Sequence, residues 1–269
     1  MKSFLKKIGL YDAIKFCHNR YKYFLQKILK LIFNSNIVLI YHRVPDVGSD
    51  PHKLCVSPKN FKEQIKYLKE NFNIVPLYEV IQDLADGQIK SGSVAITFDD
   101  GYADTLHAAL PILEKFGVPA TIFVTVGSIG LPESFYWEKG TEIKDRGRCL
   151  TKEELIKLAE HPLIDIGAHT MTHPNMAKLD KKKQEEEIML SKKRLEEIVN
   201  KNISLFAYPF GSKDSFTSET TRLVKNADFI SAVSSKKEKV FNFSKLFAVP
   251  RINIRNCDLE EFKKIIETA

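Results

Sequence analysis

Cysteine is scarce in this 269-residue chain, and no two of its cysteines form a Cys-x-x-Cys pair. The four are Cys17, Cys55, Cys149 and Cys257. Such wide spacing argues against a disulfide framework and against a zinc site built from thiolates. We therefore expect unpaired thiols in a reducing compartment. Long apolar runs are also lacking, since none reaches the about 18–20 residues that a membrane-spanning helix needs.

The net charge of +7 is concentrated in residues 1–33, which carry eight basic side chains and one acidic side chain. The rest of the chain is balanced, so it lacks the basic excess that nucleic-acid binding favours, and we expect no nucleic-acid partner. The N-terminal segment has no continuous apolar core followed by a small-residue cleavage site. We therefore do not expect it to be a secretory signal.

Residues 24–33 mix lysines with Phe, Leu and Ile in the pattern of a basic amphipathic helix. Such a helix suits the surface of an anionic membrane, but its apolar face could equally pack on the folded domain. We expect residues 1–35 to be a basic helical arm and residues 36–269 to be one domain. A cytoplasmic location, including peripheral attachment to the inner membrane surface, is favoured.

Short apolar segments alternate with helical patterns along the domain. The predicted strands cover residues 37–41, 94–98, 119–126, 163–167, 203–208, 229–233 and 247–250. The predicted helices cover about residues 58–71, 77–86, 104–116, 180–200, 216–226 and 258–267, and a capping box at residues 151–154 opens one more. This alternation indicates parallel strands joined by right-handed crossovers. It favours an α/β fold, a distorted (β/α)7-type barrel of mainly parallel strands.

Functional groups of such folds gather at the C-terminal ends of the strands. Several polar or turn residues of this sequence directly follow a predicted strand. They are His42, Asp99, Asp100, His169, Pro209 and Arg251. We therefore expect these residues to meet at one rim.

Asp99 and Asp100 stand next to each other before Gly101. Two adjacent carboxylates are costly to place together unless a positive charge lies beside them. Asp-Asp-Gly is also a common way to close a strand with a turn. Both readings, a charged site and a plain turn, stay open at this point.

His169 and His173 are separated by three residues. This spacing would put both imidazoles on one face of a helical turn, where they could bind one metal ion. Two histidines and one carboxylate form an open metal site with positions left for water and substrate.

Three motifs resemble those of the polysaccharide deacetylase family, the NodB-homology domain of carbohydrate esterase family 4. They are Thr97-Phe98-Asp99-Asp100-Gly101, His169-Thr170-x-x-His173 and Tyr208-Pro209-Phe210-Gly211. Tyr41-His42-Arg43-Val44 and Val249-Pro250-Arg251-Ile252 resemble a branch associated with bacterial exopolysaccharide and cell-surface glycan genes. The resemblance covers roughly residues 36–255.

The resemblance implies a metal-dependent hydrolase that removes N-acetyl groups from N-acetylhexosamine polymers or their precursors. It implies that Asp100, His169 and His173 bind the metal, usually zinc, and that Asp99 is the general base. The implied substrate is a glycan of the N-acetylglucosamine type. The residues expected to contact it or to hold the oxyanion are Trp137, Tyr208, Pro209, Phe210 and Gly211.

The sequence departs from the family pattern at two places. Ala207 stands where the family has an arginine that orients the catalytic aspartate. The family's final motif also supplies a late Leu-x-His, whereas no histidine follows His173 in this chain. We expect Arg251 to take over the orienting role, with His42 or protonated Asp99 as the general acid. A related amide or ester hydrolase acting on a non-polymeric substrate, and a catalytically weak glycan-binding module, remain alternatives.

Overall fold

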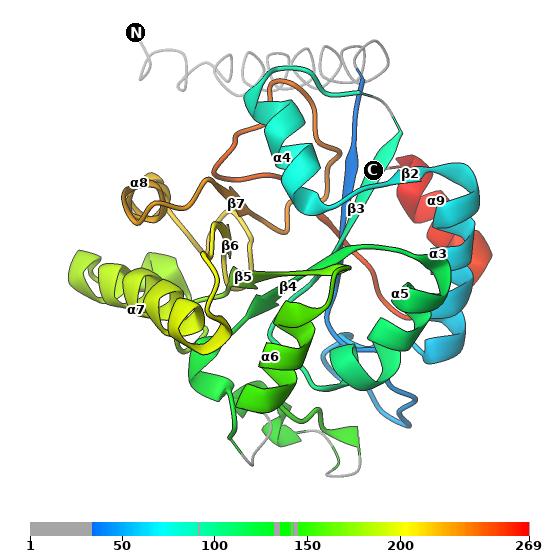
Figure 1. The fold of residues 1–269 in the computed structure, drawn as a ribbon, viewed down its shortest axis with the longest axis horizontal. Coiled ribbons are helices and arrows are strands. Elements are labelled where there is room, and N and C mark those ends of the chain that lie inside the picture. The colour runs from blue at the N-terminus through cyan, green and yellow to red at the C-terminus, as the bar shows by residue number, and fades with distance from the viewer. Residues whose placement is uncertain (1–33, 91, 132–134, 141, 143–144, 269) are drawn as a thin grey trace, which may run out of the picture.

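The computed structural model describes residues 34–90, 92–131, 135–140, 142 and 145–268, which form one curled sheet with helices around it (Figure 1). The basic arm expected at residues 1–33 lies outside the described residues. Within the described part of the chain, no helix is long and apolar enough to cross a membrane.

Every pairing between the strands of the sheet is parallel. The strands are β1 (Ile37–Tyr41), β2 (Asn73–Ile74), β3 (Ser93–Phe98), β4 (Ala120–Val124), β5 (Ile164–Ala168), β6 (Leu205–Ala207), β7 (Ser231–Val233) and β8 (Ile252–Asn253). Their order is β7-β6-β5-β4-β3-β1-β8, and the short β2 pairs with β3. Parallel neighbours need long crossovers, and the helices between the strands provide them.

One late segment joins the first strand of this order to β1. Val249 forms a parallel bridge with Val233 of β7, and three residues later Ile252 of β8 pairs with Leu39 of β1. Residues 249–253 therefore lie between β7 and β1 and curl the sheet into a barrel. The distorted (β/α) barrel predicted from the sequence is confirmed.

Two predicted elements differ from the structure. The strand predicted at residues 247–250 is wrong in position, because regular pairing begins at Ile252 and Val249 makes only an isolated bridge. The helix predicted at residues 104–116 begins with a π turn, η1 (Thr105–Ala109), before α5 (Leu110–Phe116). Pro111 lacks the N–H that a regular helical ladder would use there.

The helices begin and end at local signals. Ser57 accepts a hydrogen bond from the Asn60 amide at the start of α3 (Pro58–Asn71), and Thr151 and Glu154 form the predicted capping box of α6 (Lys152–Glu160). Gly117, with φ 61°, ends α5 in the left-handed region. The other α-helices among the described residues are α4 (Leu77–Ala85), α7 (Lys181–Val199), α8 (Ser218–Asn226) and α9 (Leu259–Thr268).

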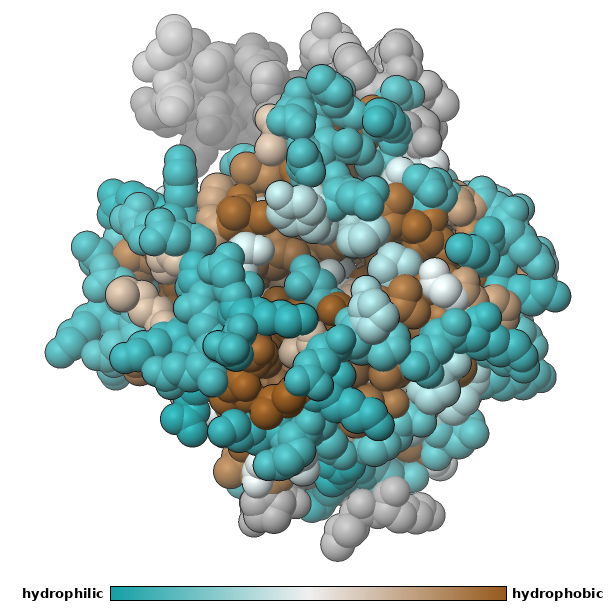
Figure 2. Space-filling view, in the orientation of Figure 1, coloured by the Kyte–Doolittle hydropathy of each residue, from teal (hydrophilic) through white to brown (hydrophobic). Residues whose placement is uncertain are grey.

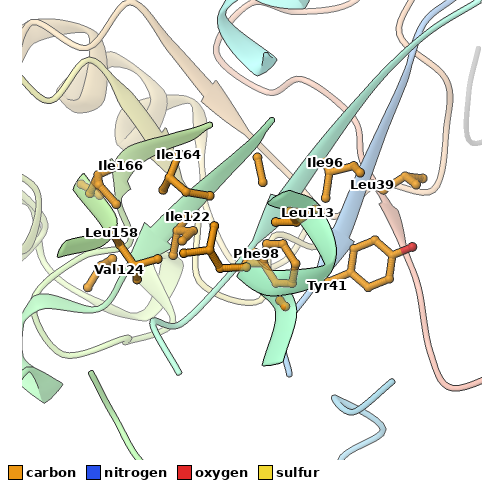
Figure 3. Packing of buried hydrophobic residues seen from close by; sticks show 14 of the residues in the cluster. Leu39, Tyr41, Ile96, Phe98, Leu113, Ile122, Val124, Leu158, Ile164 and Ile166 are labelled. Carbon is orange, nitrogen blue, oxygen red and sulfur yellow. The ribbon is translucent and has the colours of Figure 1, made fainter. Parts of the chain in front are cut away.

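Alternate residues of the central strands face two different apolar layers. Leu39, Ile96 and Ile122 point outward, where they pack with residues of the surrounding helices such as Leu113 of α5 and Leu158 of α6 (Figure 3). Burial on both faces explains why these strands read as continuous apolar runs in the sequence.

The inward-facing residues form a second cluster, which includes Val38, Ala95 and Phe123. The apolar face of α4 belongs to the same cluster, through Leu77 and Val80. The N-terminal end of the barrel is therefore closed by α4, and the C-terminal ends of the strands are left for polar groups. On the outside, polar and charged residues cover much of the face in Figure 2, with apolar residues visible between them.

Candidate active site

A cleft of about 330 Å³ lies at the C-terminal ends of the strands. It brings together residues that lie far apart in the sequence. Those predicted from the sequence are His42, Asp99, Asp100, Trp137, His169, His173, Tyr208, Phe210, Gly211 and Arg251. Pro209 was also expected here, but it is buried and does not line the cleft.

Asp99 and Asp100 form a tight turn directly after β3. The Gly101 amide donates a hydrogen bond to the Asp99 carbonyl oxygen (3.0 Å), and the residue between them, Asp100, has φ 74°. Seven described non-glycine residues have positive φ. Three of them, Asp100, His173 and Phe210, line the cleft, and Thr170 lies in the loop between His169 and His173. Strained backbone concentrated in this way is typical of a functional site. The turn and the charged site are therefore the same feature.

His169 and His173 lie on a loop after β5, so the predicted helical turn is wrong. Thr170 (φ 64°) and His173 (φ 59°) are both left-handed, and the Thr170 hydroxyl accepts a hydrogen bond from the His173 amide at 3.0 Å. This geometry, rather than helical spacing, brings the two imidazoles to a centroid distance of 4.9 Å.

Glu187 of α7 holds this histidine loop from outside. Its Oε2 accepts hydrogen bonds from the amides of Met171 and Thr172, both at 2.9 Å. Its Oε1 accepts one from the Thr172 hydroxyl at 2.6 Å. In the sequence, Glu187 is one of many charged residues in a solvated helix, so no sequence signal distinguishes it.

Asp100, His169 and His173 form a cradle that fits a metal ion. Oδ1 of Asp100 lies 3.5 Å from Nε2 of His169 and 3.4 Å from Nε2 of His173. These distances exceed a usual N–H···O hydrogen bond of about 2.7–3.2 Å. They match the spacing of about 3.4 Å between two ligands of a tetrahedral zinc with bonds of about 2.0–2.1 Å.

The hydrogen bonding of His169 and the protonation of His173 also suit a cation at this point. Burial lowers the pKa of His169, but the carboxylates of Asp99 and Asp100 outweigh it, and the pKa is raised. Nδ1 of His169 lies 2.8 Å from the Ala207 carbonyl oxygen, which fixes the proton on Nδ1 and leaves Nε2 facing Asp100. Burial lowers the pKa of His173 to about 4, so its imidazole is neutral at pH 7. Burial raises the pKa of Asp100, but the neighbouring histidines outweigh it and hold the pKa at about 2.

Asp99 has a different environment. Both of its carboxylate oxygens accept hydrogen bonds from the buried guanidinium of Arg251, at 2.8 and 2.7 Å. Arg251 is itself fixed by the Ser234 carbonyl oxygen (3.0 Å) and the Thr97 hydroxyl (2.9 Å). Burial raises the pKa of Asp99, but the charge of Arg251 and the neighbouring His169 outweigh it, and the pKa is lowered. Asp99 is therefore an ionised carboxylate in a fixed orientation at neutral pH.

Two aromatic residues flank His173. The ring of Trp137 lies 4.5 Å and that of Phe210 4.9 Å from the His173 ring, as centroid distances. Phe210 has φ 62° and is 54% exposed. A side chain at Gly211 would come within 2.4 Å of the Ser235 amide, so this turn requires glycine.

The Tyr208 side chain packs against the Phe216 ring and is anchored by its hydroxyl. Its ring stacks on Phe216 at 3.9 Å, and its hydroxyl donates to the Phe247 carbonyl oxygen. His42 lines the cleft after β1, and its Nδ1 is buried without a hydrogen-bond partner among the described residues. His52 and Asn253 also line the cleft. The sequence did not indicate them, because His52 lies in a loop and Asn253 carries no motif.

Comparison with known proteins gives the same fold and a family. The family model described as polysaccharide deacetylase matches residues 86–231. A poly-beta-1,6-N-acetyl-D-glucosamine N-deacetylase of Staphylococcus aureus (strain MRSA252) is 27% identical over 259 residues, which cover 88% of this chain and 85% of that protein.

Two solved structures share the fold. The Streptococcus pyogenes deacetylase PplD in complex with acetate has a TM-score of 0.70 at 22% identity, with 87% of this chain and 98% of that chain covered. IcaB from Ammonifex degensii has a TM-score of 0.69 at 21% identity, with 87% of this chain and 96% of that chain covered.

Proposed function

This chain belongs to the polysaccharide deacetylase family, and from that premise we propose that it hydrolyses N-acetyl groups of a polymer of N-acetylglucosamine or of its precursor. The name of the Staphylococcus aureus relative supports this substrate class. One observation carries the proposal. The cleft gives two adjacent aspartates separate surroundings, with Asp100 in a cradle of two histidines and Asp99 on a buried arginine.

We propose Asp100, His169 and His173 as the ligands of a divalent metal, and zinc as the ion. Their donor set and spacing suit an open zinc site. Held by these three residues, a divalent ion would supply Lewis acidity, which would polarise a carbonyl and make water more acidic.

Asp99 is the proposed general base. The guanidinium of Arg251 donates to one lone pair of each Asp99 carboxylate oxygen. The second lone pair of each oxygen stays available to accept the proton of the attacking water. The ion pair keeps Asp99 ionised and fixes its orientation, which is what a base needs before the substrate arrives. Arg251 thus fills the role left open by Ala207.

The backbone amide of Phe210 is the proposed donor to the oxyanion. The support is that, among the described residues, none accepts a hydrogen bond from this amide, and that Phe210 lines the cleft. A fixed donor aimed at a developing negative charge stabilises the tetrahedral intermediate.

His42 is the proposed general acid. When the C–N bond breaks, the sugar amine must take up a proton and acetate is released. His42 lines the same cleft as Asp99, and a protonated imidazole is a common general acid. Histidine at this position compensates for the lack of any histidine after His173.

Acetate release from β-1,6-linked N-acetylglucosamine oligomers in the presence of Zn²⁺ tests the proposal.

We expect Asp99→Asn to lose at least about 10²-fold in kcat, because it removes a positioned base, while zinc binding persists. We expect Asp100→Asn to lose zinc binding and turnover together. Asp86→Asn, an exposed change at the C-terminal end of α4, is the matched control and should change neither. Wild-type protein that binds zinc and oligomer without releasing acetate would contradict the proposal.

We also propose that residues 1–33 attach the enzyme to an anionic membrane surface, at the cytoplasmic side of the inner membrane. The support is the charge of this segment, which carries eight basic residues and one acidic residue interleaved with apolar ones. Deleting residues 1–33 should abolish sedimentation with anionic vesicles and leave acetate release from soluble oligomers unchanged. Equal sedimentation of both proteins would contradict this proposal.

A further inference from the structure

Trp137 forms part of the cleft wall beside a proposed metal ligand. Its ring lies 4.5 Å from that of His173 and stacks on Phe135 at 4.4 Å with an interplanar angle of 12°. Its Nε1 donates a hydrogen bond to the Tyr102 hydroxyl at 2.9 Å. The position of this ring therefore sets the width of the cleft next to His173.

The segment that carries Trp137 has little regular structure of its own. Among its described residues, regular structure near Trp137 is limited to the single turn η3 (Tyr136–Gly140). Yet Glu138 is 2% exposed. Its buried carboxylate is costly without a cationic partner, so this segment depends on a charge from elsewhere in the fold.

Arg43, the residue after His42, supplies that charge. It is 5% exposed. Its Nη1 lies 3.4 Å from Oε1 of Glu138 and donates to the Asp145 carbonyl oxygen at 2.9 Å. Its Nε donates to Oδ2 of Asp104 at 3.0 Å. One guanidinium thus joins the end of β1 and the turn after β3 to the segment that carries Trp137.

The packing around this guanidinium leaves little freedom. Its carbon lies 5.1 Å from the centre of the Tyr102 ring, the same residue that accepts the Trp137 N–H. The second oxygen of Glu138 accepts a hydrogen bond from the Gly147 amide at 2.6 Å. A Cβ at Gly147 would lie 2.4 Å from the Tyr102 ring and 2.6 Å from Nε of Arg43. Arg43 therefore reaches Trp137 by two routes, through Glu138 and through Tyr102.

We infer that Arg43 is a positioning residue for substrate binding, which fixes Trp137 as the wall of the glycan site beside His173. The inference rests on the proposed function for the substrate, but the link between Arg43 and Trp137 stands on contacts within the protein. A lysine cannot replace Arg43, because a single ammonium cannot bridge Asp104, Glu138 and a carbonyl in fixed directions.

Tryptophan fluorescence tests the link without substrate, since Trp137 is the only tryptophan of the chain. In Arg43→Met and Arg43→Lys we expect a shifted emission maximum and stronger quenching by acrylamide, with unchanged far-UV circular dichroism. Arg148→Met is the matched control, because Arg148 belongs to the same segment but pairs with Glu154 at the surface. It should leave the emission unchanged. Unchanged emission in both Arg43 variants would overturn the inference.

Steady-state kinetics on the oligomer test the functional consequence. We expect Arg43→Met and Trp137→Leu each to raise KM by about tenfold with a smaller effect on kcat, and the double variant to be no worse than Trp137→Leu alone, because residues that act through one another are not additive. Additive KM effects in the double variant would overturn the inference.

Two further outcomes are distinguishable. If Arg43→Met does not fold, Glu138→Gln keeps the arginine and weakens the same link, and it should shift the emission in the same direction. If wild-type protein releases no acetate while the emission shifts as expected, the proposed function fails and the link between Arg43 and Trp137 holds. The inference itself fails if the emission is unshifted, whether or not the wild type is active, or if an active wild type gives additive KM effects.

Discussion

The two adjacent aspartates differ because of their partners. Asp99 contacts a guanidinium that is 152 residues away in the sequence, whereas Asp100 faces two imidazoles. Asp100 also differs in its backbone, which is left-handed with φ 74°. A single residue step thus separates the proposed base from the proposed metal ligand.

Arg251→Met should shift the pH profile of kcat/KM. In the wild type, Arg251 holds the pKa of Asp99 below its ordinary value against the effect of burial. Without the cation burial dominates and the pKa rises, so the acidic limb should move to higher pH. At pH 7 we expect a loss of about 10²-fold, the lower end of what a positioned base contributes. Arg251→Lys, which keeps one charge, should shift the limb less. If the acidic limb of Arg251→Met lies at the same pH as that of the wild type, Arg251 does not set the pKa of Asp99.

At the scale of elements, helices act on the site through loops. Helix α7 contributes no residue to the cleft lining, yet its Glu187 accepts three hydrogen bonds from the histidine loop. Helix α6 is similarly anchored at its start, where Glu154 completes the capping box and pairs with Arg148.

Glu187→Gln should weaken zinc binding by about 10-fold or more, the range seen when the outer partners of metal ligands are changed. The glutamine side chain is uncharged, so it cannot accept charge-assisted hydrogen bonds from the Met171 amide, the Thr172 amide and the Thr172 hydroxyl at once. Zinc affinity by competition with a chelating dye is the measurement. Glu186→Gln, an exposed neighbour on the same helix, is the control. Equal affinity in the two variants would count against a role for Glu187.

Glu154→Gln should lower the free energy of unfolding by about 1 kcal/mol at pH 7, as for other helix caps. The hydrogen bond from Arg148 lowers the pKa of Glu154 to about 2. Because the folded pKa lies below the ordinary value of 4.5, this stabilisation is present above pH 4.5 and is lost as the pH falls toward 2. Urea unfolding at several pH values should show the difference between wild type and variant shrinking below pH 4.5. Glu153→Gln, exposed in the same first turn, should show no such trend.

At the scale of the molecule, barrel closure builds the site. The segment that joins β7 to β1 also carries Arg251, and it places this side chain inside the barrel against Asp99. Helix α4 fills the opposite end. The interior is therefore closed at one end and polar at the other.

Zinc should stabilise the whole domain, because its proposed ligands come from two different strand ends. An ion that binds only the folded state adds about 2.7 kcal/mol when its concentration is a hundredfold above Kd. We expect a corresponding rise in Tm when zinc is added to chelator-treated protein, and no rise in Asp100→Asn. A similar rise in this variant would show that zinc stabilises the fold from another site.

The sequence by itself determined the features that depend on neighbouring residues. The apolar strands, the Thr151–Glu154 capping box and the turn at Gly101 are local, because strand burial, helix capping and tight turns each involve only a few consecutive residues. The alternation of these elements was enough to predict a parallel barrel, and strand ends indicated which polar residues meet.

Only the tertiary structure decided the geometry in which these residues meet. The three-residue gap between His169 and His173 predicted a helical turn, whereas two left-handed residues and Glu187 of a distant helix set the loop. The contact of Arg251 with Asp99, which the sequence led us to expect, forms with both carboxylate oxygens because the sheet closes over 152 residues. Hydrogen bonds and ion pairs of this kind act between atoms a few ångströms apart, and chain separation carries no information about which distant side chains reach that distance.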